Sequence, residues 1–180
     1  MDVEKIIYLP FGNNLVIGNH IKKQLSFLKK KIPSDFQKKI LYDLGCGDGK
    51  ITLKLKDIFK ADRVYGCDSN ASLVWRAKRR GIKAQVLDLE KEVPKGELAI
   101  LWGVLHHLKN KKEVLEKIKS NFQYLVLREL LKVNEKKSFW ELGEPFFPKE
   151  INQLLGETLK NFKKYEDQNS IFVFWKKNYE

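Results

Sequence analysis

Short apolar runs alternate along the chain with segments whose apolar residues recur every three or four positions. The apolar runs predict five strands, at residues 39–44, 63–67, 83–87, 97–102 and 123–128. The helical spacing predicts three helices between them, at residues 49–60, 70–80 and 110–120. Strands that alternate with helices form a parallel sheet with right-handed crossovers. The central pattern therefore predicts an α/β fold.

The two ends of the chain depart from this alternation. At the N-terminal end, helical spacing predicts a helix at residues 20–31, with Asn19 as its N-cap and lysines on its polar face. At the C-terminal end, a connection at residues 129–148 is rich in aromatic residues and proline. The pattern then predicts a helix at 149–160 and a β-hairpin with strands at 161–165 and 170–175. We predict one domain, in which residues 1–38 form a helical cap or lid and residues 39–180 form a ligand-binding core.

Three glycines occupy alternate positions directly after the first predicted strand: Gly45, Gly47 and Gly49. A buried strand that leads through a glycine-rich turn into a helix is typical of nucleotide-binding α/β folds. A dinucleotide site needs a third glycine where this chain has Lys50. A phosphate loop needs Ser or Thr directly after its Gly-Lys pair, where this chain has Ile51. The spacing therefore argues against NAD and against a phosphate loop.

Negative charge beside the glycines points to a different ligand. Asp43 precedes the turn and Asp48 lies within it, where a bound phosphate would meet two carboxylates. A cationic ligand without phosphate fits better, and S-adenosylmethionine, with its sulfonium centre, is such a ligand.

The segment Asp43-Leu-Gly-Cys-Gly-Asp-Gly49 resembles motif I of the class I S-adenosylmethionine-dependent methyltransferases. Trp102-Gly-Val-Leu-His-His-Leu108 resembles the strand-four motif of the small-molecule (type 11) branch, and residues 80–90 look like the MetW-type subgroup. The resemblance implies a Rossmann-like, seven-stranded, mostly parallel sheet with a C-terminal antiparallel hairpin and helices on both faces. It also implies S-adenosyl-L-methionine as the cofactor.

The resemblance assigns cofactor contacts to the ends of the predicted strands. Asp68 ends the second strand, and an acidic residue there accepts the ribose hydroxyls. Asp88 and the next backbone amide contact the adenine, and Asp43 organises the glycine turn near the methionine moiety. The predicted cofactor-binding residues are Asp43, Gly45, Cys46, Gly47, Asp68, Ser69, Asp88, Leu89 and Trp102.

Methyl transfer is an in-line displacement whose rate depends on positioning the acceptor and excluding water. A base is needed only where the acceptor must lose a proton first. His106 and His107 are the predicted catalytic residues, since either one titrates near neutrality at the mouth of the cleft. The structural alternative is that one of them caps the turn after the strand and the other packs. The chain has no Cys/His cluster typical of a metal site.

Composition and charge indicate the cellular compartment and allow two further classes of partner. No apolar run reaches membrane-spanning length and no signal-peptide pattern is present, so we expect a cytoplasmic protein. The net charge is +12 and comes almost entirely from lysine, which allows RNA binding at residues 22–39 and 76–83. A small-molecule acceptor is the first hypothesis, RNA such as tRNA is the second, and a non-catalytic module that binds a partner protein is the third.

Overall fold

The computed structural model describes residues 14–38, 40–132, 145–167 and 169–177. The chain forms two compact units, Met1–Lys31 and Ile32–Glu180, which are described separately. The first unit contains α1, Asn14–Lys31. The predicted start at residue 20 and the predicted N-cap at Asn19 are therefore wrong, because the helix continues through Gly18. A single glycine weakens a helix without ending it.

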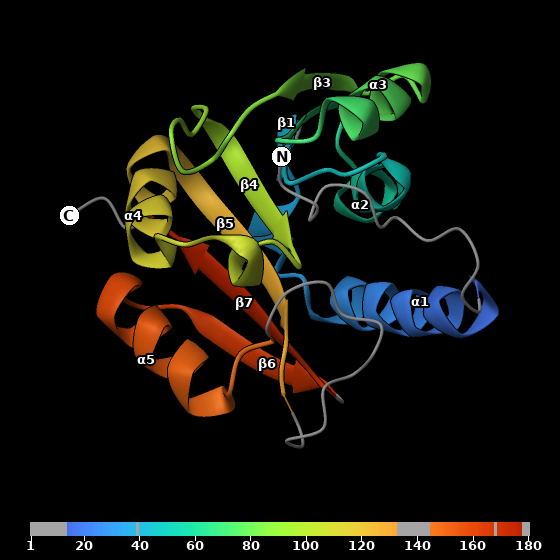
Figure 1. Cartoon of the computed structure of the whole chain (residues 1–180). Coiled ribbons are helices and arrows are strands. Elements are labelled where there is room, and N and C mark those ends of the chain that lie inside the picture. Colours follow the sequence, from blue (N-terminus) through green and yellow to red (C-terminus); the bar gives the residue numbers. More distant parts are fainter. Residues whose placement is uncertain (1–13, 39, 133–144, 168, 178–180) are drawn as a thin grey trace, which may run out of the picture. The chain divides into compact units, whose positions relative to one another are not determined.

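The second unit is built on a seven-stranded sheet in the order β3-β2-β1-β4-β5-β7-β6 (Figure 1). The strands are β1 (Ile40–Leu44), β2 (Arg63–Asp68), β3 (Lys83–Val86), β4 (Gly96–Trp102), β5 (Phe122–Leu130), β6 (Lys163–Asp167) and β7 (Ser170–Lys176). The first five strands pair in parallel, whereas β7 runs antiparallel to both β5 and β6. The predicted Rossmann-like sheet with a C-terminal antiparallel hairpin is confirmed.

Helices cover both faces of this sheet (Figure 1). They are α2 (Lys50–Phe59), α3 (Ala71–Arg79), α4 (Lys111–Asn121) and α5 (Pro148–Thr158). Alternate residues of β4, Ala99 and Leu101, belong to one apolar cluster with Leu115 of α4 and Leu155 of α5. The helices α2 and α3 lie against the other face, beside β1, β2 and β3. None of the described helices is long and apolar enough to cross a membrane.

Strand β5 extends further than the sequence predicts. The predicted strand stops at residue 128, where a charged pair, Arg128-Glu129, follows the apolar run. The observed strand continues to Leu130, since its last residues pair with β7, including Glu129 opposite Ile171. Glu129 is consequently buried in the sheet, with no exposed surface. Smaller differences occur at β3, which ends at Val86, and at β6, which covers Lys163–Asp167 rather than 161–165.

Candidate cofactor and acceptor site

The glycine turn lies at the carboxyl ends of β1 and β2, and main-chain hydrogen bonds attach it to β2. The N–H groups of Gly45 and Cys46 donate to the carbonyl oxygen of Cys67 over 2.8 and 2.9 Å. The N–H of Gly47 donates to Asp68 Oδ2 over 2.9 Å. The structure therefore brings four of the predicted cofactor residues, two glycines, Cys46 and Asp68, into one hydrogen-bonded group. The thiols of Cys46 and Cys67 are free and buried.

Asp68 joins the glycine turn to the start of α3. Its Oδ1 accepts the N–H of Asn70 over 2.9 Å, while its Oδ2 accepts Gly47. The Asn70 side chain in turn caps α3 by accepting the N–H of Ser72 over 3.0 Å. Ser69 is exposed beside this cap. Two backbone donors hold the Asp68 carboxylate, whose remaining lone pairs are available to ribose hydroxyls.

The space around the glycines tests whether the turn fits a ligand. A methyl group at Gly45 would collide with Val104, whereas a methyl group at Gly47 would meet nothing within 4 Å. Gly47 also has a φ of 53°, in the left-handed region that favours glycine. The turn therefore presents bare backbone to an open space beside Asp68, as a cradle for S-adenosylmethionine requires.

Replacing Gly47 by alanine is expected to weaken S-adenosylhomocysteine binding about tenfold or more, a loss of at least 1.4 kcal/mol, because the methyl group enters the ligand space. The left-handed φ also costs about 1–2 kcal/mol of folding free energy. Gly81→Ala is the matched control, since Gly81 has a φ of 82° and open space around it but follows α3 away from the turn. Calorimetry and urea unfolding should show similar destabilisation in both variants and lost binding only in the first. Equal binding by both variants would refute this use of Gly47.

Asp43 lies beneath the turn and connects β1 to α2. Its Oδ2 accepts the Thr52 hydroxyl at 2.5 Å, and its Oδ1 has no hydrogen-bond partner among the described residues. Burial raises the pKa of the Asp43 carboxyl to about 6, the negative charge of Asp68 adds to the rise, and the Thr52 hydrogen bond opposes it. A buried carboxylate with an unpartnered oxygen suits a site whose ligand is a cation.

The raised pKa of Asp43 makes stability depend on pH. The folded state holds this proton more tightly than the unfolded state, so the free energy of unfolding falls as pH rises from about 4 through about 6. The full loss is about 3 kcal/mol, at 1.36 kcal/mol for each pH unit by which the pKa is displaced. Asp43→Asn should remove this step in urea unfolding between pH 4 and pH 7, whereas Asp62→Asn, at an exposed position, should retain it. An unchanged slope in Asp43→Asn would contradict the assignment.

Other predicted cofactor residues have structural contacts of their own. Asp88 follows β3, and its Oδ1 accepts the N–H of Glu90 over 3.0 Å. The side chain of Leu89 is buried in the apolar cluster, so its backbone is the part available to a ligand. The ring of Trp102 packs edge-on against Phe172 at 6.2 Å between centroids. The adenine contacts of Asp88 and Leu89 and the cofactor contact of Trp102 stay predictions.

Glu129 organises the turn after β4. Its Oε1 accepts the N–H groups of Val104 and Leu105 over 2.9 and 2.7 Å. Its Oε2 lies 2.7 Å from His106 Nδ1. Because the carboxylate accepts from this side, Nδ1 carries the hydrogen and the lone pair of His106 resides on Nε2. Sequence reasoning missed Glu129, since it lies in the segment predicted to be a connection.

The rings of His106 and His107 are in contact, with centroids 4.0 Å apart and planes tilted by 42°. Burial lowers the pKa of His107, and repulsion from His106 lowers it further, while the charges of Glu129 and Asp68 act in the opposite direction. The two histidines therefore differ in their surroundings. A carboxylate orients His106, whereas His107 has no carboxylate partner among the residues that the structure describes.

A cavity of about 970 Å³ opens beside His106. Its walls are the turn after β4, the first residues of α4, Lys132 beyond β5, and the segment from Pro145 to Leu154. The segment is held near β5 by a hydrogen bond of 2.8 Å from the N–H of Lys132 to the carbonyl oxygen of Phe146. Phe146 and Phe147 belong to the predicted aromatic connection, whereas Phe139 and Trp140 lie outside the described residues.

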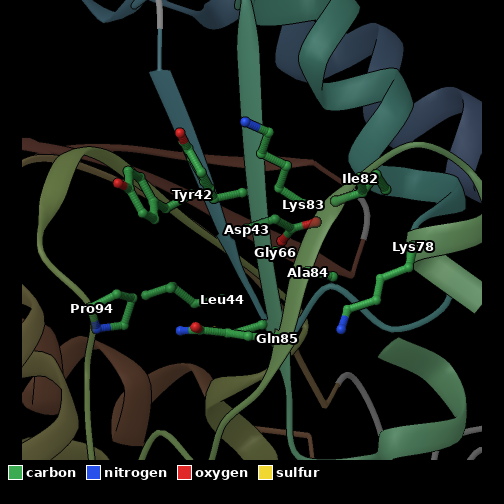
Figure 2. Close-up of a pocket in the computed structure, with 12 residues that line it drawn as sticks. Tyr42, Asp43, Leu44, Gly66, Lys78, Ile82, Lys83, Ala84, Gln85 and Pro94 are labelled. Atoms are coloured by element: carbon green, nitrogen blue, oxygen red, sulfur yellow. The ribbon is translucent and has the colours of Figure 1, made fainter. Parts of the chain in front are cut away.

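A smaller cavity, of about 330 Å³, lies against β1, β2 and β3 (Figure 2). Its lining includes Tyr42, Gly66 and Ala84, which lie within strands rather than at their carboxyl ends. Asp43 is the one predicted cofactor residue among those that line it. Ligands of parallel α/β sheets bind outside the carboxyl ends of the strands. The glycine turn lies at those ends, so it fits the predicted cofactor site better than this cavity does.

Comparison with known proteins identifies the class. Residues 42–122 match a family model described as a methyltransferase domain. A search of curated protein sequences found no match. Among solved structures, a magnesium protoporphyrin IX methyltransferase from Synechocystis PCC 6803 with bound S-adenosylmethionine is 16% identical, with a TM-score of 0.63 over 94% of this chain and 88% of that one.

Two further structures have the same fold. Mitomycin 7-O-methyltransferase is 15% identical, with a TM-score of 0.66 over 90% of this chain and 55% of that one. Human N-acetylserotonin methyltransferase in complex with S-adenosylmethionine is 18% identical, with a TM-score of 0.65 over 89% of this chain and 55% of that one. This chain thus matches about half the length of these two proteins.

The sheet order, the glycine turn and the family match define a Rossmann-like methyltransferase domain. The chain resembles the class I S-adenosylmethionine-dependent methyltransferases in its motif I, in its fold and in the family match over residues 42–122, and S-adenosylmethionine is the cofactor of that class.

Proposed function

We propose that this chain transfers the methyl group of S-adenosylmethionine to a small-molecule acceptor, with His106 as the base that Glu129 orients. When bound, S-adenosylmethionine supplies an electrophilic methyl group on a sulfonium sulfur. The observation that carries the proposal is the contact of 2.7 Å between buried Glu129 and His106, at the edge of a cavity of about 970 Å³. That volume is typical of small-molecule sites.

Glu129 and the residues of the turn after β4 have different roles in the proposed reaction. Glu129 holds the hydrogen of His106 at Nδ1, so that Nε2 is free to accept a proton from the acceptor. The same carboxylate binds the N–H groups of Val104 and Leu105, which keeps the imidazole in place relative to the sheet. The His106 side chain is only 6% exposed, which limits water around the imidazole.

One of the two basic clusters predicted to bind RNA lies away from the proposed acceptor cavity. The cluster at residues 76–83 lies on α3 and β3, on the other side of β1 from the cavity in the order of the strands. Two of its arginines are also engaged: Arg80 bonds Asp48 at 3.1 Å, and Arg79 stacks on Trp75 at 4.9 Å. This predicted RNA-binding cluster therefore does not line the proposed acceptor cavity.

The proposal is tested in two stages. Titration calorimetry with S-adenosylmethionine and S-adenosylhomocysteine measures cofactor binding, and transfer of labelled methyl groups is then followed with small-molecule and tRNA acceptor libraries. Binding together with methylation of a small molecule would support the proposal. Methylated tRNA would favour the RNA alternative, and tight cofactor binding without any acceptor would favour the non-catalytic module.

A further inference from the structure

We infer that the acceptor is an anionic small molecule with an apolar, ring-containing body. This inference rests on the proposed function, because it takes the cavity beside His106 as the acceptor site. It concerns the walls of that cavity, whose lining combines four lysines with two phenylalanines: Lys109, Lys111, Lys112, Lys132, Phe146 and Phe147.

The acidic side chains of the cavity already have partners. Glu113 forms an ion pair of 2.7 Å with Lys117, which lies one helical turn further along α4. Glu150 accepts the N–H of Phe147 over 3.0 Å at the start of α5. Even with both carboxylates counted, the four lysines leave the cavity lining with a net positive charge.

Three of the lysines have no carboxylate partner among the described residues. Lys111 donates to the carbonyl oxygen of Leu108 over 2.7 Å, which uses one of its three donors. Lys132 lies over the ring of Phe147, with its Nζ 4.5 Å from the ring centroid. Lys109 lines the cavity from the loop before α4. By contrast, Lys112 pairs with Glu157 at 3.0 Å. The cavity therefore presents unneutralised positive charge to its contents.

An apolar surface adjoins this charge. Phe146 is almost fully buried and closes the cavity beside β5, whereas 43% of Phe147 is exposed, an unusual state for a large apolar side chain. Leu154 of α5 continues the same wall. A flat apolar ligand would cover Phe147 while its anionic group reaches the ammonium groups, and its methyl-accepting atom would face His106. A cationic or purely polar acceptor would leave both features unused.

Ligand pairs that differ in charge test the inference directly. With S-adenosylhomocysteine saturating, calorimetry would compare 6-hydroxy-2-naphthoate and 6-hydroxy-2-naphthyl phosphate with the neutral 6-hydroxy-2-naphthamide. We expect at least one anion to bind about tenfold more tightly than the amide, because hydrogen bonds to charged groups contribute that much or more. The two anions show whether carboxylate or phosphate is preferred.

A matched pair of double variants tests whether the lysines of the cavity cause the preference for anions. Lys109→Gln combined with Lys132→Gln should weaken binding of the preferred anion to about the affinity of the amide, and so remove the preference for anions. Lys54→Gln combined with Lys164→Gln changes the net charge equally at exposed positions away from the cavity and should retain the preference.

Three results would overturn the inference: no preference for either anion, a preference that survives in the cavity variant, or salt-dependent tRNA binding that the cavity variant abolishes. The S-adenosylhomocysteine titration separates these from a failure of the proposed function. If that ligand does not bind, the proposed function fails; if it binds and the anion preference is absent, only the nature of the acceptor is wrong.

Discussion

Replacing Glu129 by glutamine is expected to reduce methyl transfer about 100- to 10,000-fold, the usual contribution of a general base, without loss of cofactor binding. The glutamine carbonyl oxygen can still accept the N–H groups of Val104 and Leu105, which Glu129 accepts at present. Its amide nitrogen then faces His106 Nδ1 and donates to it. The hydrogen of the imidazole moves to Nε2, where the acceptor needs a lone pair.

Nitrogen NMR of the histidine side chains measures this effect before any acceptor is known. Wild-type His106 should show hydrogen on Nδ1, and the Glu129→Gln variant should show it on Nε2. Glu92→Gln, at an exposed position, is the control and should leave the tautomer unchanged. A tautomer that stays the same in Glu129→Gln, or full methyl transfer by that variant, would remove His106 from the proposed role.

Replacing Asp68 by alanine is expected to weaken binding of S-adenosylmethionine and S-adenosylhomocysteine about 100-fold or more. The variant loses the carboxylate predicted to accept the ribose hydroxyls, and hydrogen bonds to a charged group contribute about 1.5–3 kcal/mol each. It also frees the N–H groups of Gly47 and Asn70, which Asp68 accepts over 2.9 Å each, and thereby loosens the glycine turn.

Two further variants distinguish an effect on cofactor binding from an effect on folding. Asp68→Asn keeps one oxygen for the turn and should remain folded while binding is still weakened. Asp62→Ala removes an exposed carboxylate just before β2 and should bind normally. Calorimetry would measure the cofactor affinity and urea unfolding would measure the stability of each variant. Wild-type affinity in Asp68→Ala would refute the ribose assignment.

Much of the cofactor half of the site could be predicted because its signals are local. The apolar run before Gly45 and the glycines after it define a strand and a turn within one short segment. Asp68 could be found because the next strand of a parallel sheet ends beside the previous one. The Asn70 cap is also local, since its side chain accepts from the N–H groups of Ser72 and Leu73.

The acceptor half could not be predicted in the same way. Glu129 belongs to a charged pair that reads as the end of a strand, and its burial depends on β7, about 40 residues later along the chain. The lysines of the cavity cannot be told from the many other lysines of a chain with a net charge of +12. Their common position beside His106 arises only when α4 and α5 pack on the same face of the sheet.

The sequence by itself determined the order of strands and helices, the glycine turn and its acidic partners, because hydrophobic periodicity and glycine spacing act over a few residues. It did not determine the start of α1, because Asn19, a residue type that often caps helices, lies within this helix. Only the tertiary structure decided that Glu129 meets His106 and that lysines and phenylalanines line one cavity. Those contacts join residues distant in sequence, and their geometry follows from the pairing of strands and the packing of helices rather than from any local pattern.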